Sequence, residues 1–115
     1  MTFGAASAKK RIDVAVRNSI QAGDIPGPRS LANAQEMAPR EGALIAGITR
    51  YVDSVEEIEA AIAEFAEMGV DNVKFSMSGE EITEHLRAED TTFPDELVAA
   101  GVEVRSFRFL TEDVA

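Results

Sequence analysis

Apolar residues recur every three or four positions in the middle of the chain, which is the spacing of one helix face. Ser54 stands before this stripe and Glu57 three residues later, a pair that fits a capping box. Gly69 supplies a C-terminal stop. We predict a helix from Val55 to Met68 that buries the stripe, which consists of Val55, Ile58, Ala61, Ile62, Phe65 and Met68.

A similar pattern near the N-terminus predicts a helix from about Ala8 to Ala22. Its one apolar face would carry Ile12, Ala15, Val16, Ser19 and Ile20. Gly23 ends the pattern, and residues 23–29 form a loop because two prolines there fix φ.

Alternating apolar and polar residues predict a strand from Val70 to Met77. Val73, Phe75 and Met77 would share one face, and Lys74 and Ser76 the other.

Weaker patterns complete the sequence of elements. Residues 30–34 suit a short strand, whereas residues 35–42 are polar and broken by Pro39. Residues 93–100 suit a short helix that starts at Pro94 and ends at Gly101, followed by a last strand over residues 102–110. Helices that alternate with strands predict the α/β class with a parallel sheet, of the doubly wound or barrel type.

Composition excludes several functions. The chain has 115 residues, enough for a single domain, and its net charge is −10. Such an acidic chain argues against binding to nucleic acid or to an anionic membrane surface. It has no cysteine, which excludes disulfides, and no apolar run long enough to span a membrane. The basic residues follow the small apolar residues at the N-terminus, unlike a secretory signal, so we expect a cytoplasmic protein.

Lys74 is the main candidate for chemistry. A lysine among apolar strand residues is costly to bury unless its charge is neutralised or paired. It is either a plain charge on a solvent-facing strand side or a site residue, since a desolvated lysine readily becomes a nucleophile. His85 is the one histidine. It lacks a second histidine at helical spacing, and we interpret it as a solvated polar residue.

Three stretches together resemble the metal-dependent amidohydrolases, in particular the imidazolonepropionase-like and Xaa-Pro-dipeptidase-like branch. The resemblance covers residues 8–93 of a single domain spanning 1–115, and residues 94–115 diverge. The stretches are Val14–Arg29, which contains AGDIPGPR, Val55–Lys74, and Ser76–Ile82.

The resemblance implies a partial (β/α)8 barrel, about strands 2–5 with their helices, built on a parallel sheet. It also implies a site for one or two divalent metals, zinc above all, and a small-molecule amide substrate. In that family the lysine of the fourth strand reacts with CO2 and bridges two metals as a carbamate, and the metals generate hydroxide for attack on an amide. This role carries over to Lys74 alone.

The remaining ligands of the family have no counterpart here. The family's His-x-His motif would lie before Met1, and its later histidines and aspartate would follow the matched region. We therefore expect a truncated relative of a hydrolase that acts on carbon–nitrogen bonds. On its own it would be incomplete and inactive. An alternative is that the chain itself holds no metal. The competing hypothesis is a small noncatalytic α/β module that binds a partner or another copy of itself. A second chain that completes the barrel is a third.

Overall fold

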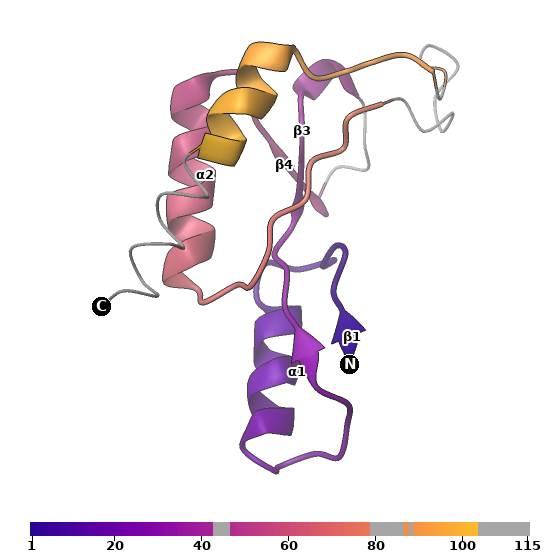
Figure 1. Cartoon of the computed structure of the whole chain (residues 1–115), viewed down its shortest axis with the longest axis vertical. Helices are drawn as coiled ribbons and strands as arrows, with labels where there is room; N and C mark the ends of the chain where they lie inside the picture. The colour runs from indigo at the N-terminus through magenta and orange to yellow at the C-terminus, as the bar shows by residue number, and fades with distance from the viewer. Residues whose placement is uncertain (43–46, 79–86, 88, 104–115) are drawn as a thin grey trace.

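The computed structural model describes residues 1–42, 47–78, 87 and 89–103. Figure 1 shows α1 and β1 at one end of the molecule, and α2, β3 and β4 at the other. The molecule is elongated, with extents of 45 × 30 × 21 Å. Residues 95–103 are also helical. The named elements are β1 (Thr2–Phe3), α1 (Ile12–Gln21), β2 (Ser30–Leu31), β3 (Glu36–Ala38), the short 3-10 helix η1 (Arg40–Gly42), β4 (Thr49–Tyr51) and α2 (Val55–Glu67).

The named strands pair in parallel, as predicted for the α/β class. β1 pairs with β2, and β3 pairs with β4. A parallel bridge between Met37 and Phe75 adds a third chain segment beside β3. The fold class is therefore a mixed α/β arrangement with small parallel sheets, and the partial (β/α)8 barrel remains a prediction.

The helix α2 confirms the clearest sequence pattern. The hydroxyl of Ser54 accepts a hydrogen bond from the backbone N–H of Glu57 at 3.2 Å. Gly69 follows the helix with a φ of +80°, which suits glycine. The predicted stripe faces the core, where Ile58, Ala61, Ile62 and Phe65 are fully buried. Capping and periodicity agree here, which is why the prediction was accurate.

The helix α1 departs from its prediction in two ways. It begins at Ile12, not Ala8, because the Ser7 hydroxyl donates a hydrogen bond to the Lys9 carbonyl oxygen at 2.6 Å and holds a turn there. Three of the five residues of the predicted apolar face, Ile12, Ala15 and Val16, are also exposed. Ile12 and Val16 keep 48% and 45% of their surface, and Val14 is the buried residue of this helix.

The strands differ more from the prediction. We predicted no element over residues 35–42, yet β3 lies there and is buried along its length. Pro39 ends β3 instead of excluding it. The predicted strand Val70–Met77 is reduced to the bridge at Phe75, and Met77 is 42% exposed.

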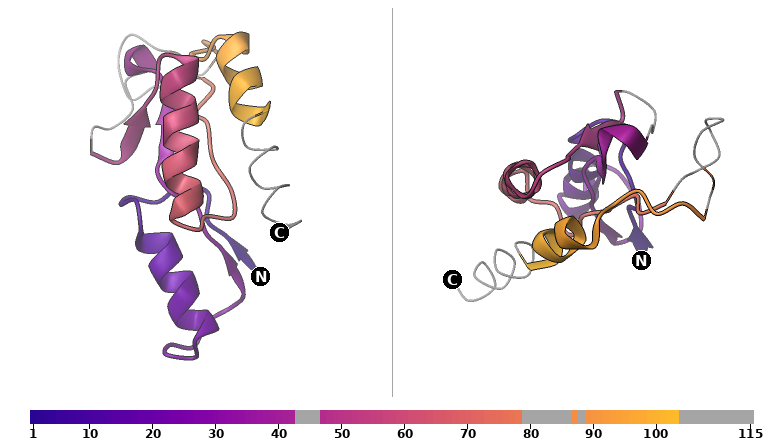
Figure 2. Two further views of the ribbon diagram at one scale, coloured as in Figure 1. Left: turned by 90° about the vertical axis from the view of Figure 1, so that its left-hand side faces the viewer. Right: turned by 90° about the horizontal axis from the view of Figure 1, so that it is seen from above.

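Near the C-terminus, Gly101 does not end a helix as predicted. It lies inside the helical residues 95–103 and is buried. A Cβ atom there would lie 3.1 Å from Phe75 Cε1 and 3.3 Å from Ile58 Cγ2, so glycine permits a close approach. Figure 2 shows this helical segment alongside α2. The helical residues 102–103 contradict the start of the predicted strand, whose residues 104–110 lie outside the described part, as does His85.

Candidate functional site

A row of polar residues crosses the three parallel segments at the end of the molecule that carries α2. β3 lies between β4 and the segment around Phe75, and Glu36 is opposite Thr49 in the register. Because Met37 is opposite Phe75, the preceding residues Glu36 and Lys74 are also neighbours. Alternation along the strands places this row on the face opposite Met37 and Phe75, the side chains that join the core.

Backbone hydrogen bonds fix the position of Lys74 beside β3. The N–H of Met37 donates to the carbonyl oxygen of Lys74 at 2.9 Å, and the N–H of Ser76 donates to that of Met37 at 2.8 Å. The two bonds lock the register of this segment against β3. The side chain of Lys74 is therefore directed by the sheet and not by a loose loop.

Lys74 forms an ion pair with Glu36. Its Nζ atom lies 2.9 Å from Oε2 of Glu36, and the two side chains are 41% and 11% exposed. No hydrogen-bond partner for this oxygen is found among the described residues, so the nearby ammonium charge is what compensates it. Of the two alternatives for Lys74, the solvent-facing charge agrees with its 41% exposure, and its role as a site residue stays a prediction.

The prediction missed Glu36. Its carboxylate is a second charged group on the polar face, but residues 35–42 were interpreted as polar and irregular. The rule that buried charges are paired predicts that a buried Lys74 needs an anionic partner, but only the sheet register identifies that partner as Glu36.

The described residues do not form a complete metal site. They contain no group of three or more His, Asp or Glu side chains placed to hold an ion. Zinc takes about four ligands, whereas Glu36 supplies one carboxylate and Lys74 lies beside it as its ion-pair partner. Within the described part, the chain thus supplies at most a portion of the metal site that the resemblance implies.

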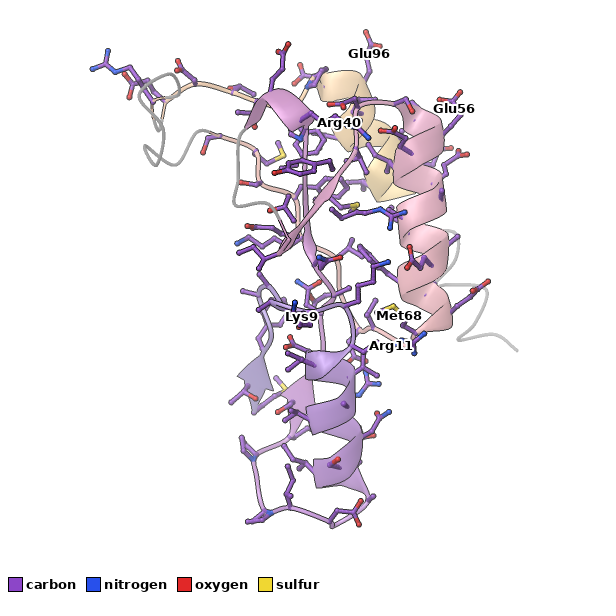
Figure 3. All side chains as sticks on the ribbon, turned by 180° about the vertical axis from the view of Figure 1, so that it is seen from behind. Lys9, Arg11, Arg40, Glu56, Met68 and Glu96 are labelled. Carbon is purple, nitrogen blue, oxygen red and sulfur yellow. The ribbon has the colours of Figure 1, made fainter. Side chains whose placement is uncertain are left out.

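Ionic contacts surround the N-terminus of α2, where Arg40 lies (Figure 3). Its guanidinium contacts Asp53 and, at 3.2 Å, Glu57. The side chain of Arg40 lowers the pKa of Glu57, helped by a hydrogen bond from the Asp53 N–H. The backbone N–H of Arg40, followed by its side chain, lowers the pKa of Asp53. All three groups are solvent-exposed, so we interpret them as a structural cap.

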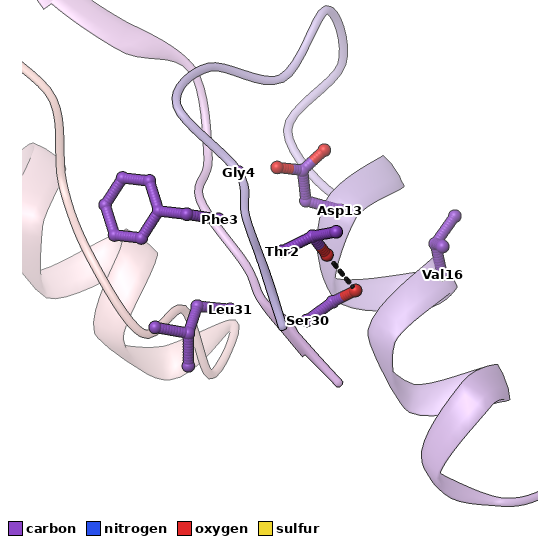
Figure 4. Close-up of a pocket in the computed structure, with 7 residues that line it drawn as sticks. All are labelled: Thr2, Phe3, Gly4, Asp13, Val16, Ser30 and Leu31. Atoms are coloured by element: carbon purple, nitrogen blue, oxygen red, sulfur yellow. Dashed lines mark hydrogen bonds between the residues drawn. The ribbon is translucent and has the colours of Figure 1, made fainter. Parts of the chain in front are cut away.

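A cavity of about 200 Å³ lies at the opposite end, between β1, β2 and α1 (Figure 4). Phe3, Val16 and Leu31 give it apolar walls. The hydroxyls of Thr2 and Ser30 bond to each other at 2.7 Å. Asp13 also lines the cavity, and its Oδ2 accepts a hydrogen bond from the N–H of Asn33 at 3.3 Å. This surface suits binding better than catalysis.

Comparison with solved structures finds a dipeptidase, prolidases and an amidohydrolase. A Xaa-Pro dipeptidase with bound methionine in its active site matches with a TM-score of 0.76 and 19% identity, over 92% of this chain and 29% of that chain. A protein from Bifidobacterium longum assigned as a prolidase matches with a TM-score of 0.75 and 26% identity, over 90% of this chain and 25% of that chain. An amidohydrolase matches with a TM-score of 0.74 and 18% identity, over 93% of this chain and 30% of that chain. The resemblance predicted from the sequence is confirmed at the level of the fold.

The chain spans 25–30% of the lengths of these three structures. No protein-family model matches the sequence, and no curated protein matches it either. In the described part of the chain, no helix has both the length and the apolar character that crossing a membrane requires.

Proposed function

We propose that this chain supplies Lys74 to the site of a metal-dependent hydrolase that acts on carbon–nitrogen bonds. The observation that carries the proposal is the placement of Lys74 on the polar face of the parallel strands, within a fold shared with a Xaa-Pro dipeptidase. The substrate would be a small amide, because the neighbours include a dipeptidase and an amidohydrolase.

The proposed role of Lys74 is that of a metal ligand after reaction with CO2. Reaction with CO2 gives the lysine a terminal carboxylate, which is a good ligand for a divalent ion. We propose zinc as the ion, within a (β/α)8 barrel. Since the described residues contain no group of three or more side chains placed to hold an ion, we also propose that the 115-residue chain alone does not hydrolyse the substrate.

Zinc uptake in bicarbonate buffer tests the role of Lys74. We expect zinc to bind weakly and to raise the melting temperature of the chain, and Lys74→Arg to abolish both effects. Arginine retains the positive charge beside Glu36, so the variant should remain folded. Lys10→Arg is the matched control, because Lys10 also pairs with a glutamate, Glu64, at 2.6 Å.

Equal zinc binding by the chain and by Lys74→Arg would refute the role of Lys74. A dipeptidase assay on the zinc-loaded chain should show no turnover. Turnover by the chain that disappears in Lys74→Arg would overturn the proposed inactivity of the chain but would support the proposed role of Lys74.

A second candidate is a noncatalytic module that pairs with another copy of itself. Exposed apolar side chains on β1 and α1 favour it, since Phe3 is 63% exposed and Ile12 and Val16 nearly half exposed. β1 pairs only with β2 among the described strands, so its outer edge is available to a second chain. Sedimentation equilibrium should then give a dimer that Val16→Lys dissociates and that Met77→Lys, outside this surface, does not. A monomer at all concentrations would exclude this candidate.

A further inference from the structure

We infer that Glu36 opposes carboxylation of Lys74, so that the ion pair between them and the lysine carbamate exclude each other. This inference rests on the proposed role of Lys74 and adds a regulatory residue to it. In the ion pair, Oε2 of the buried Glu36 carboxylate lies 2.9 Å from Nζ of Lys74, the nitrogen that would react with CO2.

Glu36 is held in place more firmly than Lys74. It lies in the middle strand of the three parallel segments, and its side chain is 11% exposed against 41% for Lys74. No hydrogen-bond donor to Oε2 of Glu36 is found among the described residues. Among the described residues, the ammonium of Lys74 is therefore the group that compensates this oxygen, and an uncompensated buried charge is strongly unfavourable.

Carboxylation would reverse the charge at this position. The lone pair of Lys74 Nζ forms a bond to the carbon of CO2, two protons of the ammonium leave to solvent, and the side chain ends as an anionic carbamate. Glu36 would then lose its counter-ion and face a second negative charge a few ångströms away. At the reduced dielectric of a partly buried site, such a contact strongly favours the uncarboxylated lysine.

The ion pair thus opposes carboxylation of Lys74 until a further charged group compensates Glu36. A cation placed between the two carboxylates would neutralise both, so carboxylation should be favoured when a divalent ion arrives. Without such an ion, the chain should hold Lys74 as the partner of Glu36.

NMR of the full chain in ¹³C-labelled bicarbonate, without added metal, tests this inference. The chain has three lysines, Lys9, Lys10 and Lys74, so a carbamate signal can be assigned with Lys74→Arg, which should lack it. We expect Glu36→Gln to raise the carbamate at Lys74 about tenfold, because it removes the charge and keeps the shape of the side chain. Glu36→Asp, which keeps the charge, should remain near the level of the unsubstituted chain.

Glu64→Gln is the matched control. It removes a carboxylate that lies 2.6 Å from Lys10 in an exposed pair, and it should leave the signal of Lys74 unchanged. Thermal melting of each variant shows whether it is folded. Glu36→Ala, which also lacks the charge, takes the place of Glu36→Gln if the latter does not melt cooperatively.

Two results would overturn the inference, and they bear differently on the proposed function. An equal amount of carbamate at Lys74 in the unsubstituted chain and in Glu36→Gln would show that Glu36 does not oppose carboxylation. The proposed carboxylation of Lys74 would then still stand. No carbamate in either folded protein would overturn the role of Glu36, and repeating the measurement with zinc added would then decide the proposed role of Lys74.

Discussion

Lys74 and Lys10 each pair with a glutamate, but the two pairs differ in burial. The Lys10–Glu64 pair is exposed at 45% and 34%, whereas Glu36 in the other pair is only 11% exposed. Removing Lys10 leaves Glu64 with a second cation, because Arg50 Nη1 lies 2.8 Å from its Oε2. No second ion pair of Glu36 is found among the described residues, so removing Lys74 leaves that glutamate without a counter-ion there. The loss of the lysine should therefore cost more at Glu36, whose side chain is also less accessible to water than that of Glu64.

Stability measurements on Lys74→Met and Lys10→Met should separate the two pairs. We expect Lys74→Met to lower the free energy of unfolding by about 1–3 kcal/mol, because it leaves a buried carboxylate unpaired. Lys10→Met should cost about 0–0.5 kcal/mol, as is typical for an exposed pair. Urea denaturation measures both, and equal losses would contradict the difference in burial.

The cluster around Arg40 predicts a pH dependence of stability. The folded-state pKa values of Asp53 and Glu57 are lowered by Arg40, so these carboxylates bind protons less readily in the folded chain. The stability that they contribute is complete above their unfolded pKa values, near pH 4, and is lost as the pH falls through the lower folded values.

Melting curves of Arg40→Gln and of the unsubstituted chain should therefore converge on acidification. The variant should melt at a lower temperature at pH 7, and the difference should shrink below about pH 4. In Arg40→Gln, the pKa of Glu57 should return further toward its ordinary value than the pKa of Asp53. Asp53 keeps the hydrogen bond from the backbone N–H of residue 40. A difference independent of pH would show that Arg40 acts through packing.

At the scale of elements, local signals predicted α2 well and β3 poorly. The capping residues and the apolar stripe of α2 lie within one stretch of sequence, so they can be recognised together. β3 has three residues, and its burial is imposed by β4 and by the segment around Phe75, which lie far along the chain. The same limit applies to the site, because Lys74 is visible in an apolar stretch but its partner Glu36 is defined only by the sheet register.

The helical residues 95–103 pack against Phe75 through Gly101. Gly101→Ala should improve helix propensity by about 1 kcal/mol but cost about 1–3 kcal/mol from overlap with the ring, for a net loss of stability. In a Phe75→Leu background the overlap is relieved, so the same substitution should become stabilising. Urea denaturation of the four proteins measures this change of sign, and stabilisation in both backgrounds would contradict the close approach.

At the scale of the whole molecule, Arg17 connects its two ends. Its Nη1 atom donates to the carbonyl oxygen of Gly69 and to Oδ2 of Asp71, both at 2.7 Å. Asp71 in turn accepts a hydrogen bond from the N–H of Ala32, also at 2.7 Å. These bonds tie α1 to the turn after α2 and to the chain between β2 and β3, the region where Lys9 and Met68 lie in Figure 3.

Loss of this connection should loosen one end of the molecule selectively. α1 buries only Val14, so it has little apolar packing to hold it when Arg17 is removed. We expect Arg17→Met to raise hydrogen exchange in α1 about tenfold or more, while α2, with four fully buried side chains, exchanges as before. Arg29→Met, in the exposed loop after α1, is the control and should change neither helix. Equal acceleration in α1 and α2 would mean that the two ends unfold as one cooperative unit, and the apolar surface of α1 would then be stabilised by contacts that do not depend on Arg17.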